Sequence, residues 1–298
     1  MEAHVARVLE MQGRTAIVPF LADITPTIEE LRALKPRLVF NLTEWLAGDR
    51  RHDAAIAGVL EMLNLRYTGA PPEGLRLARD KALAKDIAAR VGVEVARHAV
   101  VNGRAKLEAD VRFPIIVKPQ FGDGSDEIGK AALVRSARAL KMRIAAIRGR
   151  SSEPLLCEEY VEGRDLFVGL LGNAPQVMPA LELVLGRRGR GAPEFATARV
   201  KNDAAYREKW RVNYRVAELP QEVLEKIDEA SRRLFHALKL RDYARIDYRL
   251  TPDNRLVFLE ANPNPDLTPH TFGRDRCFAG VTYIELITGI VKAALARK

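Results

Sequence analysis

Two acidic side chains near the end of the chain are spaced so that they could bind a hard metal ion. The stretches ARIDYRL and RLVFLE are rich in apolar residues, and TPDN between them is a turn sequence, so we predict a hairpin. We pair Leu250 with Arg255. Side-chain alternation then places Asp247 and Glu260 on one face, on a diagonal about 5.5 to 8 Å apart. Arg245 shares that face.

An amide follows the second strand of this hairpin. Asn262 lies two residues beyond Glu260 in LEANPNPDLTPH and can return to the same side. Pro263 and Pro265 fix φ and stiffen the loop. Two carboxylates and an amide oxygen suit Mg²⁺ or Mn²⁺, which often share their remaining positions with substrate phosphates. The alternative is a salt-bridged hairpin with an ordinary proline-rich exit.

A metal with phosphate predicts lysines aimed at the same place. Lys118 ends the apolar strand FPIIVKP, and a loop with Gly122, Gly124, Ser125 and Gly129 follows. Such a loop can turn backbone N–H groups toward an anion. It matches neither GxxxxGK[ST] nor GxGxxG. The alternative is a solvent-facing lysine after a strand.

A third acidic group stands where two further strands meet. In LLCEEYVEGRDLFVG, Glu158 and Glu159 end one strand, Asp165 begins the next, and Gly163 lies in the short turn between them. Acidic acceptors and free backbone groups at such a crossing could bind the edge of a purine and a ribose. They could equally be the polar end of a hairpin.

The elements that must position these residues fall into three regions. We predict an N-terminal α/β domain over 1–76, in which the strands TAIVPF and RLVFNL alternate with helices as in a parallel layer. A central subdomain over 77–157 and a C-terminal one over 158–298 follow. Asp80 is expected to cap a helix that ends at Gly92, and TYIE is a capping box for the last helix. Residues 186–215 show no steady period, which predicts a long lid or binding loop.

Bulk properties exclude several classes of protein. The chain has 298 residues, is 47% hydrophobic and has no apolar run near the roughly 20 residues that cross a bilayer, so we expect a cytoplasmic globular protein. Cys157 and Cys277 lack metal or disulfide spacing. Of the net charge of +9, six come from residues 186–215, which points to an anion near this segment. Because GRRGRG lacks aromatic residues to stack on bases, nucleic acid is not expected as a partner.

In chain order, RDKALAK, FPIIVKP, EEYVEGRD, ARIDYRL and LEANPNPDLTPH resemble the D-alanine–D-alanine ligase family of the ATP-grasp superfamily. The resemblance covers about residues 37–298 and implies an ATP-grasp fold of α/β and α+β type, with two α+β subdomains clasping ATP. It implies roles by motif position, with Ser125 of the glycine loop as a second catalytic candidate beside Arg245. The remaining assignments are ATP binding by Lys81, Lys118, Glu158, Glu159, the backbone near Val161, Asp165 and Lys201, and two Mg²⁺ on Asp247, Glu260 and Asn262.

The resemblance further implies an ATP-dependent carboxylate–amine ligase that acts through an acyl phosphate on amino acids or short peptides, and a possible homodimer. An ATP-binding regulatory protein without ligase turnover is the alternative. The chain departs from the family pattern where the amino-acid substrates bind. It starts without the family's first strand and glutamate, and Asn202, Asp266 and Thr271 replace the usual tyrosine, glycine and serine. His270 is expected to be structural or to contact a substrate.

Overall fold

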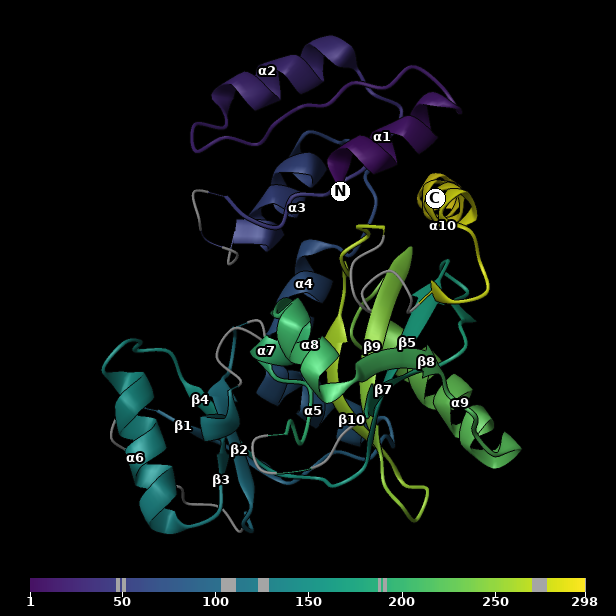
Figure 1. Ribbon diagram of the computed structural model, residues 1–298. Helices are drawn as coiled ribbons and strands as arrows, with labels where there is room; N and C mark the ends of the chain where they lie inside the picture. The colour runs from purple at the N-terminus through teal and green to yellow at the C-terminus, as the bar shows by residue number, and fades with distance from the viewer. Residues whose placement is uncertain are drawn as a thin grey trace.

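Two antiparallel sheets carry the residues singled out above, as a computed structural model of the chain shows (Figure 1). The structure describes residues 1–46, 49, 52–102, 111–122, 129–186, 189, 192–269 and 278–297; the side chains of Lys130, Lys201 and Asn202 are also left out. Ser125, His270, Thr271 and Cys277 therefore lie outside the described residues. The mixed helix and sheet architecture confirms the predicted fold class.

The smaller sheet has the strand order β1-β4-β2-β3. Its strands are β1 (His98–Val101), β2 (Ile115–Pro119), β3 (Leu133–Val134) and β4 (Leu155–Glu159), with the short 3₁₀ turn η2 (Lys130–Ala132) before β3. Helix α6 (Ala137–Arg148) packs on it, because Leu140 and Ile147 are buried against Val117 and Cys157. Ser136 caps this helix by accepting from the N–H of Ala139 at 3.2 Å. The result is a small α+β unit at the lower left of Figure 1.

The larger sheet has the order β10-β9-β5-β7-β8, and β6 pairs with β5. Its strands are β5 (Arg164–Leu171), β6 (Gln176–Val177), β7 (Leu181–Leu185), β8 (Val212–Val216), β9 (Tyr243–Leu250) and β10 (Leu256–Asn262). Alternation along β5 divides its side chains between two faces. Leu166 and Val168 pack under helices α5 (Lys81–Arg90) and α9 (Gln221–Ala237). Asp165 and Phe167 belong to the other face, where the site is built.

That second face is covered partly by the two ends of the chain. Helix α1 (Glu2–Glu10) and helix α10 (Tyr283–Ala296) lie side by side above the sheet (Figure 1), and Val8 and Ile290 join the same buried cluster as Phe167. The predicted capping box of α10 is confirmed: Thr282 and Glu285 exchange hydrogen bonds. No described helix combines the length and the apolar character that a membrane span requires.

The N-terminal region is more helical than predicted. Besides α1 it contains α2 (Thr25–Leu34), α3 (Asp53–Met62) and α4 (Pro72–Arg79), and neither TAIVPF nor RLVFNL forms a strand. A single parallel bridge joins Val39 to Tyr67. Ile17 is 64% exposed, so the segment around it has no sheet to pack on. One rung of a ladder does not extend without neighbouring strands on either side. The N-terminal parallel layer is thus reduced to this bridge in the described residues.

The predicted lid loop also contains regular structure. Within 186–215, helix α7 (Ala198–Asn202), helix α8 (Ala204–Trp210) and most of β8 are formed. Thr197 and Asp203 cap the two helices by accepting from the N–H groups of Val200 and Tyr206 at 3.3 and 2.9 Å. These helices are too short for sequence periodicity to reveal. Tyr206 and Tyr214 are buried in the core beside α1 and α10, which holds the segment to the larger sheet.

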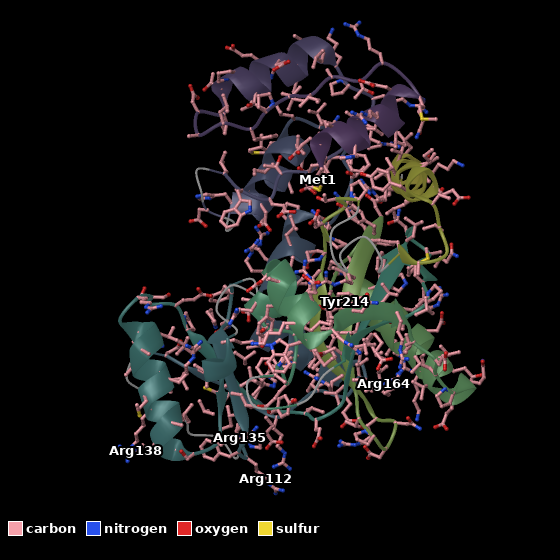
Figure 2. All side chains as sticks on the ribbon, viewed as in Figure 1. Met1, Arg112, Arg135, Arg138, Arg164 and Tyr214 are labelled. Atoms are coloured by element: carbon pink, nitrogen blue, oxygen red, sulfur yellow. The ribbon has the colours of Figure 1, made fainter. Side chains whose placement is uncertain are left out.

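Several cationic side chains lie around the smaller sheet, and Figure 2 labels three of them, Arg112, Arg135 and Arg138. Arg135 makes an exposed ion pair with Glu194 at 2.8 Å. Such exposed pairs contribute little to stability, about 0 to 1 kcal/mol. The positive charge of the chain is therefore spread over solvated surface as well as over the lid segment.

Candidate active site

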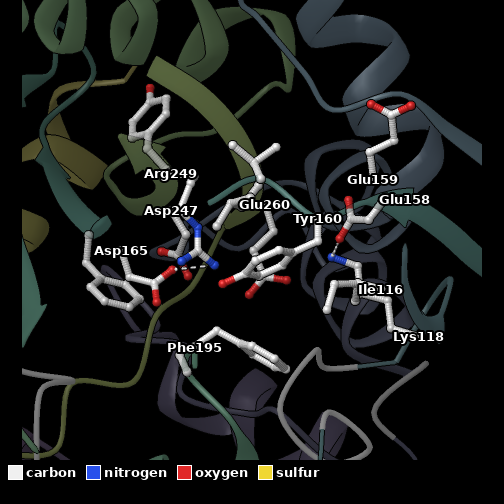
Figure 3. Close-up of a pocket in the computed structure, with 15 residues that line it drawn as sticks. Ile116, Lys118, Glu158, Glu159, Tyr160, Asp165, Phe195, Asp247, Arg249 and Glu260 are labelled. Atoms are coloured by element: carbon white, nitrogen blue, oxygen red, sulfur yellow. Dashed lines mark ion pairs between the residues drawn. The ribbon is translucent and has the colours of Figure 1, made fainter. Parts of the chain in front are cut away.

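A pocket at the junction of the two sheets collects most of the predicted site (Figure 3). Seven of the predicted residues line it: Lys118, Glu158, Glu159, Val161, Asp165, Asp247 and Glu260. They come from both sheets and from the turn that joins β4 to β5. Arg245 and Asn262 are cross-strand partners next to Asp247 and Glu260, but they do not line the pocket. Lys81 does not line it either. Ser125 and the side chain of Lys201 lie outside the described residues.

A buried carboxylate between two lysines forms one side of the pocket. Glu158 forms ion pairs with Lys118 at 2.5 Å and with Lys85 at 2.9 Å. Burial alone would raise the pKa of Glu158, but the two ammonium charges lower it to about 2. Lys118 is therefore held by the side chain of Glu158. This carboxylate, which we predicted to take part in ATP binding, fixes a lysine that faces the pocket.

Lys85 was not among the residues we singled out, although it stands in the RDKALAK motif. Its side chain is fully buried, and its ammonium also donates to the backbone oxygen of Phe258 at 3.2 Å. Burial lowers the pKa of Lys85, whereas the pKa of Lys118 is raised despite burial because Glu158 and Glu260 both attract its charge. The spacing of Lys81 and Lys85, one helical turn apart on α5, was the available signal.

Lys81 points to the start of the glycine loop. It is the first residue of α5, behind the predicted cap Asp80, which accepts from the N–H of Leu83 at 3.0 Å. Its ammonium donates to the backbone oxygen of Gly122. Burial, and the nearby charge of Lys118, lower the pKa of Lys81 to about 8. Lys81 is thus a buried cation beside the loop that we predicted to bind an anion.

The turn after β4 brings aromatic and backbone groups to the pocket. Tyr160 and Val161 line it, and the ring of Tyr160 lies 6.0 Å from that of Phe195, centroid to centroid. The Glu159 carboxylate accepts from the N–H of Arg112 at 2.8 Å and points away from Glu158 (Figure 3). Only the backbone of Glu159 is directed to the pocket side. Phe195 is the first residue of the segment FATARVK, which ends with Lys201.

At the other end of the pocket Asp165 forms a buried ion pair. Arg249 lies directly opposite it on β9, and its Nη2 is 3.0 Å from the aspartate oxygen. Both side chains are less than a tenth exposed. Arg249 stands in ARIDYRL two residues after Asp247, so side-chain alternation could have placed it on the same face.

The predicted hairpin forms, but its register differs from the one we assigned. Leu256 pairs with Leu250 and Phe258 with Tyr248, one residue away from the predicted pairing. Continued regularly, this register would put Leu259 opposite Asp247 and turn Glu260 to the core face. A β-bulge between Phe258 and Glu260 adds one residue and makes Glu260 the direct partner of Asp247. The two carboxylates therefore share a face as directly opposed residues, and the predicted diagonal is wrong.

The lining of the pocket agrees with this bulge. Leu259 and Glu260 are consecutive residues of one strand, yet both line the pocket. In a regular strand one of them would face the core. Phe258 and Ala261 on either side are both buried in the core under α9.

Arg245 holds the Asp247 carboxylate with two hydrogen bonds, from Nε at 2.6 Å and from Nη2 at 2.9 Å. Its guanidinium lies 5.5 Å from the ring centroid of Phe167. Asn262 is the cross-strand partner of Arg245. The predicted sharing of one face by Arg245, Asp247 and Glu260 is thus confirmed.

The donor set fits a hard divalent cation. It consists of two opposed carboxylates and an amide two residues beyond Glu260, and oxygen donors of this kind are the ones Mg²⁺ and Mn²⁺ prefer. The amide nitrogen of Asn262 is buried without a hydrogen-bond partner. A half-turn of the amide exchanges nitrogen for oxygen and would satisfy that position with a cation. No group of three or more Asp, Glu, His or Cys side chains that could hold a metal ion occurs in the described part of the chain.

The loop after β10 is held from the opposite side. Asn264 accepts from the N–H of Ala70 at 2.9 Å, and a Cβ on Gly69 would lie 2.5 Å from the same amide oxygen. Asp266 accepts from the N–H and the hydroxyl of Thr268 at 2.8 and 2.5 Å. The second Asn of the motif therefore joins this loop to the N-terminal region, and Asp266 stabilises a local turn.

Comparison with known proteins identifies a family for this arrangement. The family model described as the D-ala D-ala ligase C-terminus matches residues 86–292, which include all fifteen pocket-lining residues. A D-alanine–D-alanine ligase of Gluconobacter oxydans is 31% identical over 278 residues, covering 92% of this chain and 86% of the relative. An uncharacterized protein of Sinorhizobium fredii, y4sG, is 32% identical over 262 residues, covering 87% of this chain and 75% of the relative.

Solved structures share the fold. The D-alanine–D-alanine ligase of Bacillus anthracis complexed with ATP superimposes with a TM-score of 0.68 at 21% identity, covering 90% of this chain and 83% of that one. The D-alanine–D-alanine ligase of Coxiella burnetii gives a TM-score of 0.66 at 20% identity, with coverages of 87% and 68%.

Proposed function

The chain belongs to the D-alanine–D-alanine ligase family, and we propose that the pocket between its two sheets is the ATP site of a ligase that joins two small amino acids. The family identifies the protein as an ATP-dependent carboxylate–amine ligase. The observation that carries our assignment is the convergence of seven predicted residues from two sheets on one pocket.

The reaction has two steps, and both need charge neutralised more than they need a strong base. A carboxylate oxygen of the first amino acid attacks the γ-phosphorus of ATP, ADP leaves, and an acyl phosphate forms. The amine of the second amino acid then attacks the acyl carbon, loses a proton, and expels phosphate with the bonding electrons. Lysines, an arginine and a divalent metal suit such charge development.

We assign the lysines to the phosphates of ATP. Lys118 is fixed by Glu158 at 2.5 Å, and Lys81 stands at the glycine loop, so both ammonium groups can be oriented before ATP arrives. A preorganised cation stabilises developing negative charge without reorganising during the reaction. Lys201 is assigned the same role from the lid, and Ser125 remains a catalytic candidate of the glycine loop.

The turn after β4 is assigned to the base and the ribose. Tyr160 and Phe195 line the pocket and offer apolar ring surface to a purine, while backbone groups at Glu159 and Val161 can bind its edge. Asp165 is assigned to the ribose hydroxyls. Glu158 supports this region indirectly, because its own carboxylate is occupied by two lysines.

Asp247, Glu260 and Asn262 would hold the divalent metal, for which we propose Mg²⁺ or Mn²⁺. The metal supplies charge neutralisation between the phosphates. Arg245 donates two hydrogen bonds to Asp247 and so stands beside the metal ligands, where its charge can stabilise the transferring phosphoryl group and the later tetrahedral intermediate. Covering of the pocket by the lid segment would exclude water that otherwise hydrolyses the acyl phosphate.

Phosphate release from ATP tests the proposal directly. We expect release that depends on both a divalent metal and a pair of amino acids. Two molecules of D-alanine are the first pair to test, because relatives of the chain are named D-alanine–D-alanine ligases. Other small D- and L-amino acids follow, and each amino acid alone is the control. ATP binding without release for any pair would contradict the amino-acid ligase.

Two further proposals concern assembly and location. A homodimer is supported by the family resemblance, and light scattering at several protein concentrations tests it. A cytoplasmic location is supported by the use of ATP, and fractionation of cells that produce the protein tests it.

A further inference from the structure

Arg249 lies in the pocket without a part in the assignments above. Its neighbours on the same face of β9 are Asp247 and Arg245. Its own contacts lie toward β5, at the end of the pocket that we assign to the ribose. It contacts Asp165 through Nη2 at 3.0 Å and donates from Nη1 to the backbone oxygen of Gly163 at 3.1 Å. Its guanidinium carbon lies 5.6 Å from the centroid of the Tyr160 ring. Figure 3 shows Arg249 between Asp165 and Tyr160.

These contacts fix the guanidinium in one orientation. The turn at Gly163 packs closely on the end of β9, because a Cβ at this residue would lie 2.2 Å from the backbone oxygen of Leu250. Gly163 also has φ +154, which places it at the edge of the region that favours glycine. The planar guanidinium is thus anchored by a carboxylate, a carbonyl and an aromatic face.

One donor of Arg249 is left over. Its Nε is buried and has no hydrogen-bond partner, although the side chain lines the pocket and is only 8% exposed. A buried donor without a partner is unfavourable, so such an atom points to an acceptor that arrives with a ligand. The carboxylate of Asp165 offers an acceptor beside this donor. Its Oδ1 pairs with Arg249, and its Oδ2 can accept a hydrogen bond from a hydroxyl group.

We propose that Arg249 is a positioning residue that makes this pocket selective for a ribonucleotide. It orients Asp165 so that the carboxylate accepts from a ribose hydroxyl, and its Nε–H donates to an oxygen of the same nucleotide. A nucleotide that lacks the 2′-hydroxyl leaves part of this buried pair unsatisfied and binds more weakly. The inference rests on the proposed ATP site.

A purely structural ion pair makes a different prediction. Buried pairs are often nearly neutral for stability, and a pair that only holds β5 to β9 would affect all nucleotides equally. Selectivity between ATP and 2′-deoxy-ATP therefore separates the two roles. The chain offers a control next to Asp165. Arg164, labelled in Figure 2, pairs with Glu182 across β5 and β7 at 2.8 Å, and neither of these residues is among those that line the pocket.

The experiment measures dissociation constants of ATP and 2′-deoxy-ATP by calorimetry with Mg²⁺ present, for the unchanged protein and for Arg249→Met, Arg249→Lys and Arg164→Met. We expect the unchanged protein to prefer ATP by about tenfold. Arg249→Met should weaken ATP binding about tenfold and reduce the preference to below about twofold. Arg164→Met should preserve both values.

Arg249→Lys guards against a folding defect. It keeps a charge for Asp165 but lacks the Nε–H and the planar geometry, so we expect a folded protein, checked by its melting temperature, that has also lost the preference for ATP. An unchanged preference in Arg249→Met or Arg249→Lys overturns the inference and leaves the ATP site standing. Absence of ATP binding by the unchanged protein overturns both.

Discussion

The two walls of the pocket differ in the sign of their excess charge. We call the pocket-lining Lys118 and Glu158, with Lys85 buried behind them, the lysine wall. The pocket-lining Asp247 and Glu260, with Arg245 bound to Asp247, form the carboxylate wall. The first has two cations around one carboxylate, and the second has two carboxylates with one guanidinium. The lysine wall is suited to an anion and the carboxylate wall to a cation. ATP with a bound metal ion carries both charges, so the two walls suit the two parts of the proposed ligand.

Glu260 differs in burial from the other charged residues of the two walls. Lys85, Lys118 and Asp247 are at most 5% exposed in their side chains, whereas Glu260 is half-buried. Changes in the lysine wall should therefore affect folding as well as activity, whereas a change at Glu260 should affect activity alone. The predictions that follow test this difference.

The largest effect is expected on the carboxylate wall. Glu260→Gln keeps the shape of the side chain but removes a charge that the metal needs. We expect a loss of metal-dependent phosphate release of about 10³-fold, with the free energy of unfolding changed by less than about 1 kcal/mol. Steady-state kinetics and urea unfolding measure the two quantities. Activity at the level of the unchanged protein would refute the metal assignment.

Lys118→Met removes the cation of the lysine wall that lines the pocket. Its ammonium faces Glu158 directly and is attracted by Glu260 as well, so both walls lose a partner. We expect kcat/KM for ATP to fall about 10²-fold. The melting temperature should also fall, since Glu158 keeps only Lys85. A stable protein with a normal KM for ATP would show that Lys118 does not contact phosphate.

Lys85→Met tests the far side of the lysine wall. Lys85 is fully buried behind Glu158 and reaches Phe258, so its loss should be mainly structural. We expect a loss of about 3 kcal/mol in the free energy of unfolding and about a tenfold fall in kcat/KM for ATP. Arg255→Met, in an exposed ion pair with Glu94, is the control and should change neither. A fall in kcat/KM for ATP of much more than tenfold, with the free energy of unfolding little changed, would show that Lys85 contacts ATP directly.

The smallest effect concerns Lys81 and pH. Its pKa of about 8 means that its charge is lost between pH 7 and 9, so the KM for ATP should rise about fivefold over this range. Lys81→Arg should abolish the rise, because arginine stays charged.

The same group affects stability with the opposite sign. The unfolded chain, where Lys81 titrates near 10.5, binds more protons between pH 8 and 10.5. The contribution of Lys81 to stability therefore rises over that window while ATP affinity falls. A KM that is independent of pH would place Lys81 away from the phosphates.

Much of this architecture follows from local patterns. The β9–β10 hairpin was predictable because strand alternation and a turn sequence operate over a few residues, and the caps Asp80 and Thr282 are similarly local. Lys118 and Glu260 were identified because each stands at the end of an apolar run, and Asp247 because side-chain alternation places it on the same face as Glu260. All three line one pocket.

The remainder depends on tertiary context. Helices α7 and α8 are shorter than two full periods of a hydrophobic pattern, so only their caps, Thr197 and Asp203, signalled them. The bulge in β10 leaves no mark in the sequence, since one added residue is detected only by comparing the two strands. The burial of Lys85 depends on which face of α5 meets β10. The helical N-terminal region reflects the lack of strands beside Val39 in the described residues.

The bulge also separates what the sheet requires from what the pocket requires. Leu259 has no partner on β9, so the ladder would close without it and Glu260 would still stand opposite Asp247. Leu259 is thus an extra residue of β10 that lines the pocket. A deletion inside a central strand normally reverses every side chain beyond it. Here the chain could be shortened by one residue without that reversal, so insertion and deletion at this position offer a route by which the pocket wall can diverge while Glu260 stays opposite Asp247.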